Sequence, residues 1–205
     1  MNKTGYPQHK SRERGRPREF DMELALDMAM IVFRQKGFHA SSIADLGEAM
    51  GLTAGSIYKA FQDKRTLFLR VFERYTALRH AELKQRLEPF PTGREQLAEL
   101  LRFYIDSAST LEGRRGCLVV GSMNELRILD PDVSELVLQA VMRNKQNLIS
   151  LLRLGQDDGS VSASLNVETA AGVLLCLVFG MRVVGKVEDV TEKEETIRLA
   201  LKLLD

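Results

Sequence analysis

The sequence predicts an all-α protein of about nine helices, with an N-terminal three-helix unit followed by a larger helical domain. Apolar residues recur at intervals of three and four along nearly the whole chain, which is the spacing of one face of a helix. Short polar residues that cap helices precede these stretches, and glycine or proline follows them. No segment alternates apolar and polar residues as a half-buried strand does, and no internal repeat is present.

Residues 1–19 form a basic arm without apolar periodicity, and we expect them to be flexible in the free protein. Arg14 and Arg16 flank Gly15, and Pro17 favours an extended backbone at Arg16. Two arginines presented in this way suit the negative potential of a narrow, A·T-rich minor groove. The alternative is a solvated basic tail that only adds attraction to phosphates.

The first helix is predicted to begin after Asp21, whose side chain can cap the free N–H groups of a first turn. Its predicted core stripe consists of Leu24, Met28, Ile31, Val32 and Phe33. Gly37 is expected to end this helix, because glycine readily takes the left-handed conformation that terminates helices.

Residues 41–64 predict two short helices joined by a tight turn. The first covers about 43–50, after a serine cap. Gly51 lets the chain turn, and Thr53 caps a second helix over about 54–61. Two helices joined in this way form a helix-turn-helix, whose second helix enters the major groove of DNA.

Six further helices are predicted in the rest of the chain, and a charged loop at 112–116 separates two of them. Thr92 with Glu95, and Thr191 with Glu194, have the Ser/Thr-x-x-Glu spacing of a capping box. The helix that follows residue 166 is almost wholly apolar. The predicted starts are Asp63, Thr92, Cys117, Asp130, Asn166 and Thr191.

Composition favours a soluble, cytoplasmic protein. Apolar residues make up 44% and charged residues 28% of the 205 residues, which is ordinary for one medium domain or two small ones. No window approaches the roughly 18 continuous apolar residues of a membrane span, and the polar N-terminus lacks the apolar core of a signal peptide. Residues 1–65 carry eleven basic and eight acidic residues, and residues 66–205 carry eighteen and twenty. This asymmetry is too small to indicate a nucleic-acid binder by itself.

The sequence offers little for catalysis or metal binding. Cys117 and Cys176 do not make a disulfide framework, and neither CxxC spacing nor clustered histidine suggests a metal site. No Ser/His/Asp arrangement or glycine-rich phosphate loop is present. We therefore expect no enzymatic activity, no metal and no cofactor.

The helix-turn-helix and the helix before it carry a spaced set of motif residues. They are Phe33, Gly37, Phe38, Ser42, Ile43, Leu46, Gly51, Leu52, Thr53, Gly55, Ser56, Ile57, Tyr58, Phe61, Lys64 and Leu67. Each position alone is weak evidence, but the whole set in register resembles the DNA-binding domain of TetR-type (TetR/AcrR) transcriptional regulators. The resemblance implies a DNA-binding domain over residues 20–65 and an effector-binding and dimerisation domain over residues 66–205.

The resemblance also implies DNA contacts. It places Ser42, Thr53, Tyr58 and Lys64 on phosphates, and Ala54, Gly55, Ser56 and Lys59 near the floor of the groove. Many family members carry Lys or Arg where this chain has Ala54, and a His pair where it has Lys59-Ala60, so long donors are few. Base readout is then expected from Lys59, from Ser56 and from contact of Ala54 with a thymine methyl. The alternatives are a core position for the Tyr58 ring and a solvated Lys59.

By the same resemblance the partners are a double-stranded, palindromic DNA operator, a second copy of the chain and an unidentified small-molecule effector that releases DNA. No membrane partner is expected. The apolar helix after Asn166 and the last, amphipathic helix suit an interface to which each subunit gives two helices. The alternative for residues 167–187 is a helix buried within one subunit. An architectural DNA binder without an effector is the second functional reading.

Cys117 follows Arg114 and Arg115 and falls in the first turn of a predicted helix, and both features lower the pKa of a thiol. Helical spacing places Asn124 on the same face. The RGCL segment, together with Lys186, is similar to a branch of TetR-type regulators that respond to electrophiles, oxidants or unsaturated small acids.

That similarity makes Cys117 a sensing thiol and Lys186 its charged neighbour. The alternative is a buried cysteine that acts as a small hydrophobe. Arg182 either pairs with an acidic ligand or marks the exposed edge of the bundle. Cys176 lies inside an apolar run, and we predict a core position for it.

Overall fold

The computed structural model describes residues 20–205, and within this range the chain forms ten α-helices, one 3₁₀ segment and no strand. The predicted all-α fold is confirmed. The helices are α1 (Met22–Ala40), α2 (Ile43–Met50), α3 (Ala54–Phe61), α4 (Lys64–Leu87), α5 (Gly93–Ser107), α6 (Thr110–Arg115), α7 (Leu118–Glu125), α8 (Pro131–Asp157), α9 (Val167–Val184) and α10 (Lys193–Leu201), and η1 (Lys202–Leu204) is the 3₁₀ segment.

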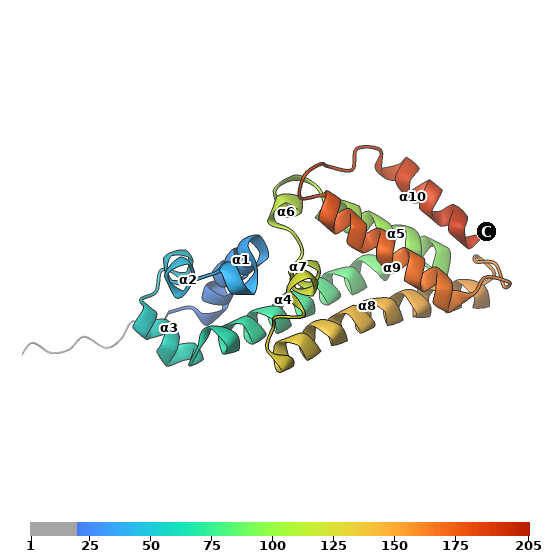
Figure 1. Cartoon of the computed structure of the whole chain (residues 1–205). Helices are drawn as coiled ribbons and strands as arrows, with labels where there is room; N and C mark the ends of the chain where they lie inside the picture. The colour runs from blue at the N-terminus through green and yellow to red at the C-terminus, as the bar shows by residue number, and fades with distance from the viewer. Residues whose placement is uncertain (1–19) are drawn as a thin grey trace, which may run out of the picture.

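Helices α1–α3 form one end of the molecule, and α4 runs from there into the second group of helices (Figure 1). Their shared core consists of large side chains that are at most 1% exposed: Phe33, Leu46, Ile57, Phe61 and Phe68. The rings of Phe33 and Phe68 meet edge to face, with their centroids 5.0 Å apart. The three N-terminal helices are therefore packed directly on the first turns of α4.

Helix α1 begins as predicted but buries a different face. The Asp21 carboxylate accepts the backbone N–H groups of Glu23 and Leu24. Leu24 itself is 56% exposed, so its predicted core position is wrong. The buried stripe is Ala25, Leu26, Ala29, Met30, Val32 and Phe33. Two alanines belong to this face, where α1 packs against α2 and α4, so size alone did not identify every buried position.

Helices α5, α8 and α9 pack against one another in the second half of the chain, and α10 lies on α5 (Figure 1). The side chains of the predicted caps Asp63, Thr92, Asp130 and Asn166 all accept a backbone N–H. These caps supply acceptors for donors that a first helical turn leaves free.

Two local predictions in this half are wrong. The predicted charged loop contains α6, in which Arg115 pairs with Glu112 at 2.6 Å. Helix α10 starts without a side-chain cap, because Glu194 binds Arg102 of α5 at 2.8 Å instead of closing a capping box with Thr191. A local ion pair thus supports the helix that replaces the loop, and a long-range ion pair replaces the capping box.

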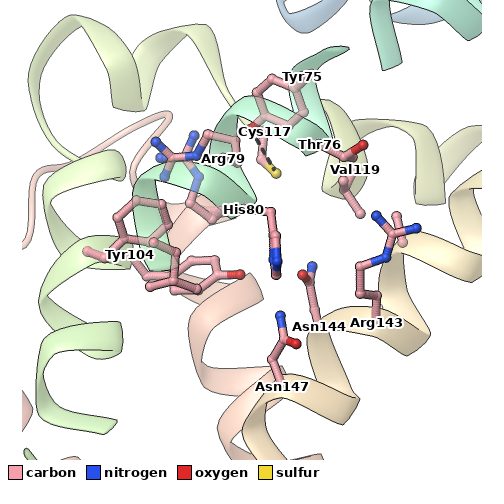
Figure 2. Close-up of a pocket in the computed structure, with 14 residues that line it drawn as sticks. Tyr75, Thr76, Arg79, His80, Tyr104, Cys117, Val119, Arg143, Asn144 and Asn147 are labelled. Atoms are coloured by element: carbon pink, nitrogen blue, oxygen red, sulfur yellow. Dashed lines mark hydrogen bonds between the residues drawn. The ribbon is translucent and has the colours of Figure 1, made fainter. Parts of the chain in front are cut away.

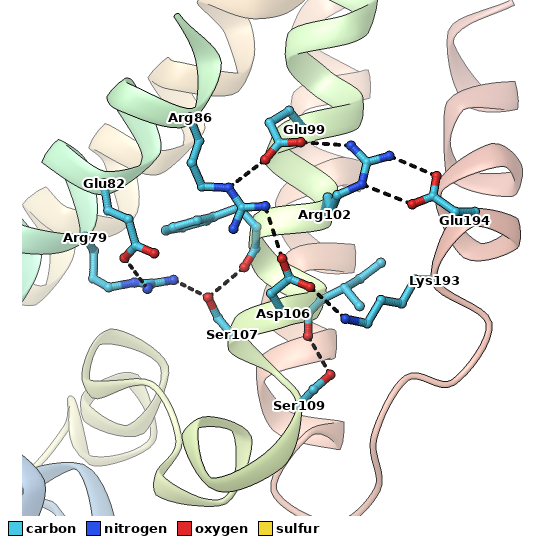
Figure 3. A network of polar contacts seen from close by, with 12 residues as sticks. Arg79, Glu82, Arg86, Glu99, Arg102, Asp106, Ser107, Ser109, Lys193 and Glu194 are labelled. Atoms are coloured by element: carbon cyan, nitrogen blue, oxygen red, sulfur yellow. Dashed lines mark hydrogen bonds and ion pairs between the residues drawn. The ribbon is translucent and has the colours of Figure 1, made fainter. Parts of the chain in front are cut away.

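A network of polar side chains around the buried Glu99 fastens α10 and α4 to α5 (Figure 3). Glu99, which is 6% exposed, accepts hydrogen bonds from Arg86 at 2.6 Å and from Arg102 at 2.8 Å. Asp106 binds Arg86 at 3.1 Å and Lys193 at 2.8 Å. Through charge-assisted hydrogen bonds, Glu99 therefore joins α5 to α4, and Asp106 joins α5 to both α4 and α10.

Helix α9 is apolar on a face that nothing in the described chain covers. Val173, Val183 and Val184 are about half exposed, and Cys176 is exposed, so the predicted core position of Cys176 is wrong. Among residues 20–205 α9 is also the one helix whose length and mean hydropathy of 1.9 would allow a membrane span, contrary to the expectation that no window comes close. Length and composition alone give this match, because α9 packs on α5 and α8 and buries Arg182 inside the protein.

Candidate nucleic-acid interface and effector cavity

The turn between α2 and α3 is held in one conformation by local contacts. Gly51 adopts a left-handed conformation with φ 64°, and Leu52 donates its N–H to the Gly47 carbonyl at 2.9 Å. A Cβ on Gly47 would lie 2.8 Å from the Leu52 carbonyl oxygen, so the close approach of the turn to α2 requires glycine there. The Ser42 hydroxyl accepts the Asp45 N–H, and the Asp45 carboxylate accepts the Ser42 N–H in return. Hydrogen bonds from Lys36 and from Ser42 hold the pKa of Asp45 far below its usual range.

Helix α3 presents a polar, small-residue surface to solvent. Ile57 and Phe61 face the core, whereas Tyr58 is 50% exposed and Lys59 is exposed. The core alternative for the Tyr58 ring is therefore wrong. The remaining residues of this surface are Thr53, Ala54 and Gly55, which are exposed, and Ser56, which is half-buried.

Lys64 has partners within the protein that the sequence did not reveal. Its ammonium donates to the carbonyl oxygens of Phe38 at 2.8 Å and Ser41 at 2.9 Å, and lies 4.5 Å from the centroid of the Phe38 ring. These contacts tie the start of α4 to the end of α1. Two of the three ammonium protons are therefore used internally, and the predicted phosphate contact has one left. The predicted arm residues Arg14 and Arg16 lie outside the described residues.

A cavity of about 60 Å³ lies between α4, α5, α7, α8 and α9 (Figure 2). Its wall contains the Cys117 thiol and the guanidinium-bearing side chains of Arg79, Arg143 and Arg182. Figure 2 shows the polar ends of His80, Asn144 and Asn147 turned toward one another across the space. Cys117 and Arg182, which were predicted as effector residues, are thus brought together.

Cys117 is a buried thiol, 8% exposed, at the N-cap of α7. The Tyr75 hydroxyl donates a hydrogen bond to its sulfur at 3.4 Å. Burial acts to raise the pKa of Cys117, but the charge of Arg182, the Tyr75 hydroxyl and the first N–H groups of α7 outweigh it and lower that pKa. Burial, with the neighbouring sulfur, raises the pKa of Tyr75, which keeps its proton and remains a donor.

The other two predicted effector residues lie elsewhere. Asn124 is exposed near the end of α7 and is not part of the cavity wall, so the predicted shared face with the thiol is wrong. Cys117 is an extended N-cap residue, so helical spacing does not relate its side chain to that of Asn124. Lys186 is exposed and lies over Gly116, where a Cβ would overlap its side chain. It is therefore a neighbour of the residue before the thiol, outside the cavity.

Arg182 is 3% exposed, which excludes the predicted exposed edge as its position. Its Nη2 donates to the Gly116 carbonyl oxygen at 3.0 Å, and its Nη1 is buried with no hydrogen-bond partner among the described residues. The same carbonyl oxygen accepts a second hydrogen bond, from Arg34 Nε of α1 at 2.9 Å. One peptide group next to the thiol thus joins the cavity to the helix-turn-helix unit.

A second contact joins α7 to α1 at the other end of α7. The Glu125 carboxylate accepts the backbone N–H groups of Phe38 at 3.1 Å and His39 at 3.4 Å. These two N–H groups have no acceptor within α1, because Gly37, with φ 80°, interrupts the helix. Neither Arg34 nor Glu125 was expected from the sequence as a site residue, although a helix that breaks at Gly37 leaves backbone groups without partners.

Comparison with known proteins agrees with this geometry. Residues 25–71 match the model for bacterial regulatory proteins of the tetR family, and residues 93–201 match the tetracyclin repressor-like C-terminal domain. The second match alone spans more than half of the chain. The chain belongs to the TetR family of bacterial regulatory proteins. It is a DNA-binding transcriptional regulator of that family.

Relatives of this TetR-family regulator support the assignment. It is 28% identical to the HTH-type transcriptional repressor ComR of Escherichia coli K12, over 84% of this chain and 82% of that protein. It is 35% identical to the repressor BdcR of the same strain, over 63% of this chain and 64% of that protein. A cysteine mutant of the TetR-family regulator CifR, solved with a 26-bp operator DNA, superposes with a TM-score of 0.73 at 31% identity, over 93% of this chain and 98% of that one.

Proposed function

We propose that this TetR-family regulator is a homodimeric repressor that binds a palindromic operator in the cytoplasm and leaves it when a small molecule or an electrophile reaches the cavity at Cys117. The observation that carries the proposal is the Gly116 carbonyl, which Arg34 of the DNA-binding half and Arg182 of the cavity wall share. A change at the cavity therefore has a direct route to the helices that contact DNA.

The proposed DNA contact places the N-terminal end of α3 in the major groove. Thr53, Ala54 and Gly55 are small and exposed there, so the helix end can approach base edges closely. Lys59 supplies the long donor for base readout, with Ser56 and the Ala54 methyl as shorter contacts. Positioning on phosphates comes from Ser42, Thr53, Tyr58 and the third ammonium proton of Lys64.

The arm is proposed to add Arg14 and Arg16 in the adjacent minor groove. The test is deletion of residues 1–18. Unchanged operator affinity would show that the arm makes no contact, and a uniform loss at every sequence would indicate phosphate attraction alone.

The proposed dimer interface is the exposed face of α9 together with α10. Val173, Val183 and Val184 on α9 and Leu199 and Leu203 after it are each about half exposed. Two helices from each subunit can then close a four-helix bundle with coiled-coil-like packing. A two-fold axis through this bundle places the two α3 helices on related half-sites of one duplex.

Release is proposed to follow covalent modification of the Cys117 thiolate. Addition to an unsaturated carbonyl compound forms a bond from sulfur to the β-carbon, and the electron pair of the C=C bond moves to the α-carbon, which takes a proton from water. The added group occupies a cavity of about 60 Å³ and displaces its neighbours Tyr75 and Arg182. Because Arg182 holds the Gly116 carbonyl, its movement reaches Arg34 and α1.

The experiment is selection of binding sites from random duplex DNA with the purified full-length protein, followed by treatment with N-ethylmaleimide. We expect an approximately palindromic site, a loss of affinity of about tenfold or more on alkylation, and no such loss in Cys117→Ser. Cys176→Ser is the matched control and keeps the response. Binding without sequence preference, or release that persists in Cys117→Ser, would contradict the proposal.

A further inference from the structure

The wall of the Cys117 cavity, as the described residues form it, carries three guanidinium groups and no carboxylate, so within it only the Cys117 thiol, as its thiolate, can offer them a negative charge. Arg79, Arg143 and Arg182 line it, and no Asp or Glu among the described residues does. Arg79 is neutralised by Glu82 at 2.8 Å outside the cavity. Arg143 and Arg182 make no ion pair within residues 20–205. Arg182 is therefore a buried guanidinium without an ion-pair partner in the described part of the chain, and Arg143, which is exposed, adds a second positive charge at the cavity.

Arg182 gives the sharper observation. The side chain is almost fully buried, and Nη1 has no acceptor in the described protein, although Nη2 is satisfied by the Gly116 carbonyl. A buried, unpaired charge is costly, and such groups are nearly always paired with an opposite charge. An anion seated against Nη1 would supply both the missing acceptor and the missing counter-charge.

The size of the space limits what the anion can be. The cavity of about 60 Å³ has room for only a few non-hydrogen atoms, which suits a single head group. It adjoins a larger groove of about 550 Å³ with which it shares His80, Leu83 and Asn147. Leu83, Leu87, Leu100 and Leu151 supply the apolar surface of the outer groove, and polar side chains, among them Lys84 and Glu88, complete its wall. A ligand longer than its head group can extend only into this groove.

We propose that the effector is an organic acid whose carboxylate binds Arg182, with Arg143 adding charge, and whose apolar remainder lies in the leucine-lined outer groove. This inference rests on the proposed function, because it names the class of molecule that fills the effector cavity. Asn144, Asn147 and the Tyr104 hydroxyl supply further hydrogen bonds to the head group. Burial raises the pKa of Tyr104, so its hydroxyl stays protonated and can donate.

The test uses the full-length Cys117→Ser protein, so that no covalent reaction contributes. Calorimetric titration is carried out with straight-chain carboxylates from acetate to decanoate and with the matching primary amides. We expect each longer carboxylate to bind more tightly, because each added CH₂ is buried in the outer groove. Each amide should bind at least about tenfold more weakly than its acid, because it brings no counter-charge to Arg182.

Two variants and a control locate the head group. Arg182→Met and Arg143→Met should each weaken carboxylate binding and leave amide binding unchanged. Arg153→Met, on the same helix as Arg143 but outside the cavity, should bind like the parent protein. Arg143 is exposed and has no hydrogen bond among the described residues, so its variant keeps the test valid if Arg182→Met fails to fold.

Equal affinity for acids and amides, absence of binding across the whole series, or unchanged binding in both arginine variants would overturn the inference. Operator binding and its release by N-ethylmaleimide are measured separately on the wild-type protein. If these succeed while no carboxylate binds, only the ligand class is wrong. If the protein has no specific operator, the proposed function fails whatever the carboxylates do.

Discussion

Lys59 and Lys64 both belong to the DNA-binding end of the molecule, yet their ammonium groups have different surroundings. Lys59 is exposed and makes no hydrogen bond within the described residues, whereas Lys64 is bound to two carbonyl oxygens and lies against the Phe38 ring. A spacing motif cannot distinguish them, because the carbonyls of Phe38 and Ser41 reach Lys64 only when the chain folds. The two lysines should therefore respond differently to substitution.

Lys64→Met should lower the free energy of unfolding by about 1–3 kcal/mol, because two carbonyl oxygens lose their donor and the Phe38 ring loses the charge above it. Denaturant unfolding of the purified protein measures this directly. Lys59→Met is the matched control and should change stability by less than about 0.5 kcal/mol. A neutral Lys64→Met would show that the internal hydrogen bonds do not matter.

Lys59→Met should instead relax sequence preference. Loss of a base contact costs about 1–3 kcal/mol at the base pair concerned and leaves affinity for other sites nearly unchanged. Binding to the selected operator and to its single-base variants measures the preference position by position. If all variants lose affinity equally, Lys59 contacts phosphate and α3 is oriented differently from our proposal.

The lowered pKa of Cys117 predicts the pH dependence of its alkylation. The thiolate is the reactive form, so the rate rises with pH and levels off above the pKa. Because Arg182 and Tyr75 lower that pKa, the rise should be centred below the value of about 8.5 of an ordinary thiol. Arg182→Met removes the positive charge and should move the rise to higher pH.

The measurement is the rate of iodoacetamide incorporation at Cys117 across neutral and alkaline pH, read by mass spectrometry of the peptide. The Cys176 thiol in the same sample is an internal reference, because it lies exposed on α9. A Cys117 profile that stays unchanged in Arg182→Met would mean that the guanidinium does not control the thiol.

At the scale of elements, α7 connects the cavity to α1, in addition to α4, which runs through both halves of the molecule. Its start carries Cys117 next to the shared Gly116 carbonyl, and its end carries Glu125 against the interrupted end of α1. The caps of α4, α5, α8 and α9 were predictable because a cap and its helix are neighbours in sequence. The contacts of α7 were not, because Arg34 and Glu125 meet partners about eighty residues away in the chain.

Glu125→Ala should weaken the coupling between cavity and DNA more than it weakens DNA binding. The N–H groups of Phe38 and His39 lose their acceptor, so the end of α1 no longer follows α7. We expect the ratio of operator affinities before and after alkylation to fall by about tenfold, a coupling of roughly 1.4 kcal/mol. Hydrogen exchange at Phe38 and His39 should become faster. A ratio equal to that of the wild type would show that α7 does not transmit the change at the cavity to the DNA-binding helices.

At the scale of the whole molecule, the proposed dimer interface on the exposed face of α9 would set the spacing of the two DNA-binding units. One helix-turn-helix unit contacts too few base pairs for specific binding, so two copies must be held at a fixed spacing. The sequence indicated this face through the apolar run after Asn166. The sequence could not show which side of this helix faces out, because both sides are apolar. Only the packing of α5 and α8 on α9 distinguishes the buried side from the exposed side.

Val173→Glu should convert the protein to a monomer and reduce operator affinity by about a hundredfold or more, because a charge would be buried without a partner at the interface. Light scattering after size-exclusion chromatography gives the oligomeric state, and binding to one full operator and to one half-site gives the affinities. The monomer should bind both DNAs equally weakly. Ile128→Glu is the control, since Ile128 is 66% exposed and lies outside α9 and α10, and it should leave the dimer intact. A Val173→Glu protein that remains a dimer would place the two-fold axis on another face and would require a different half-site spacing.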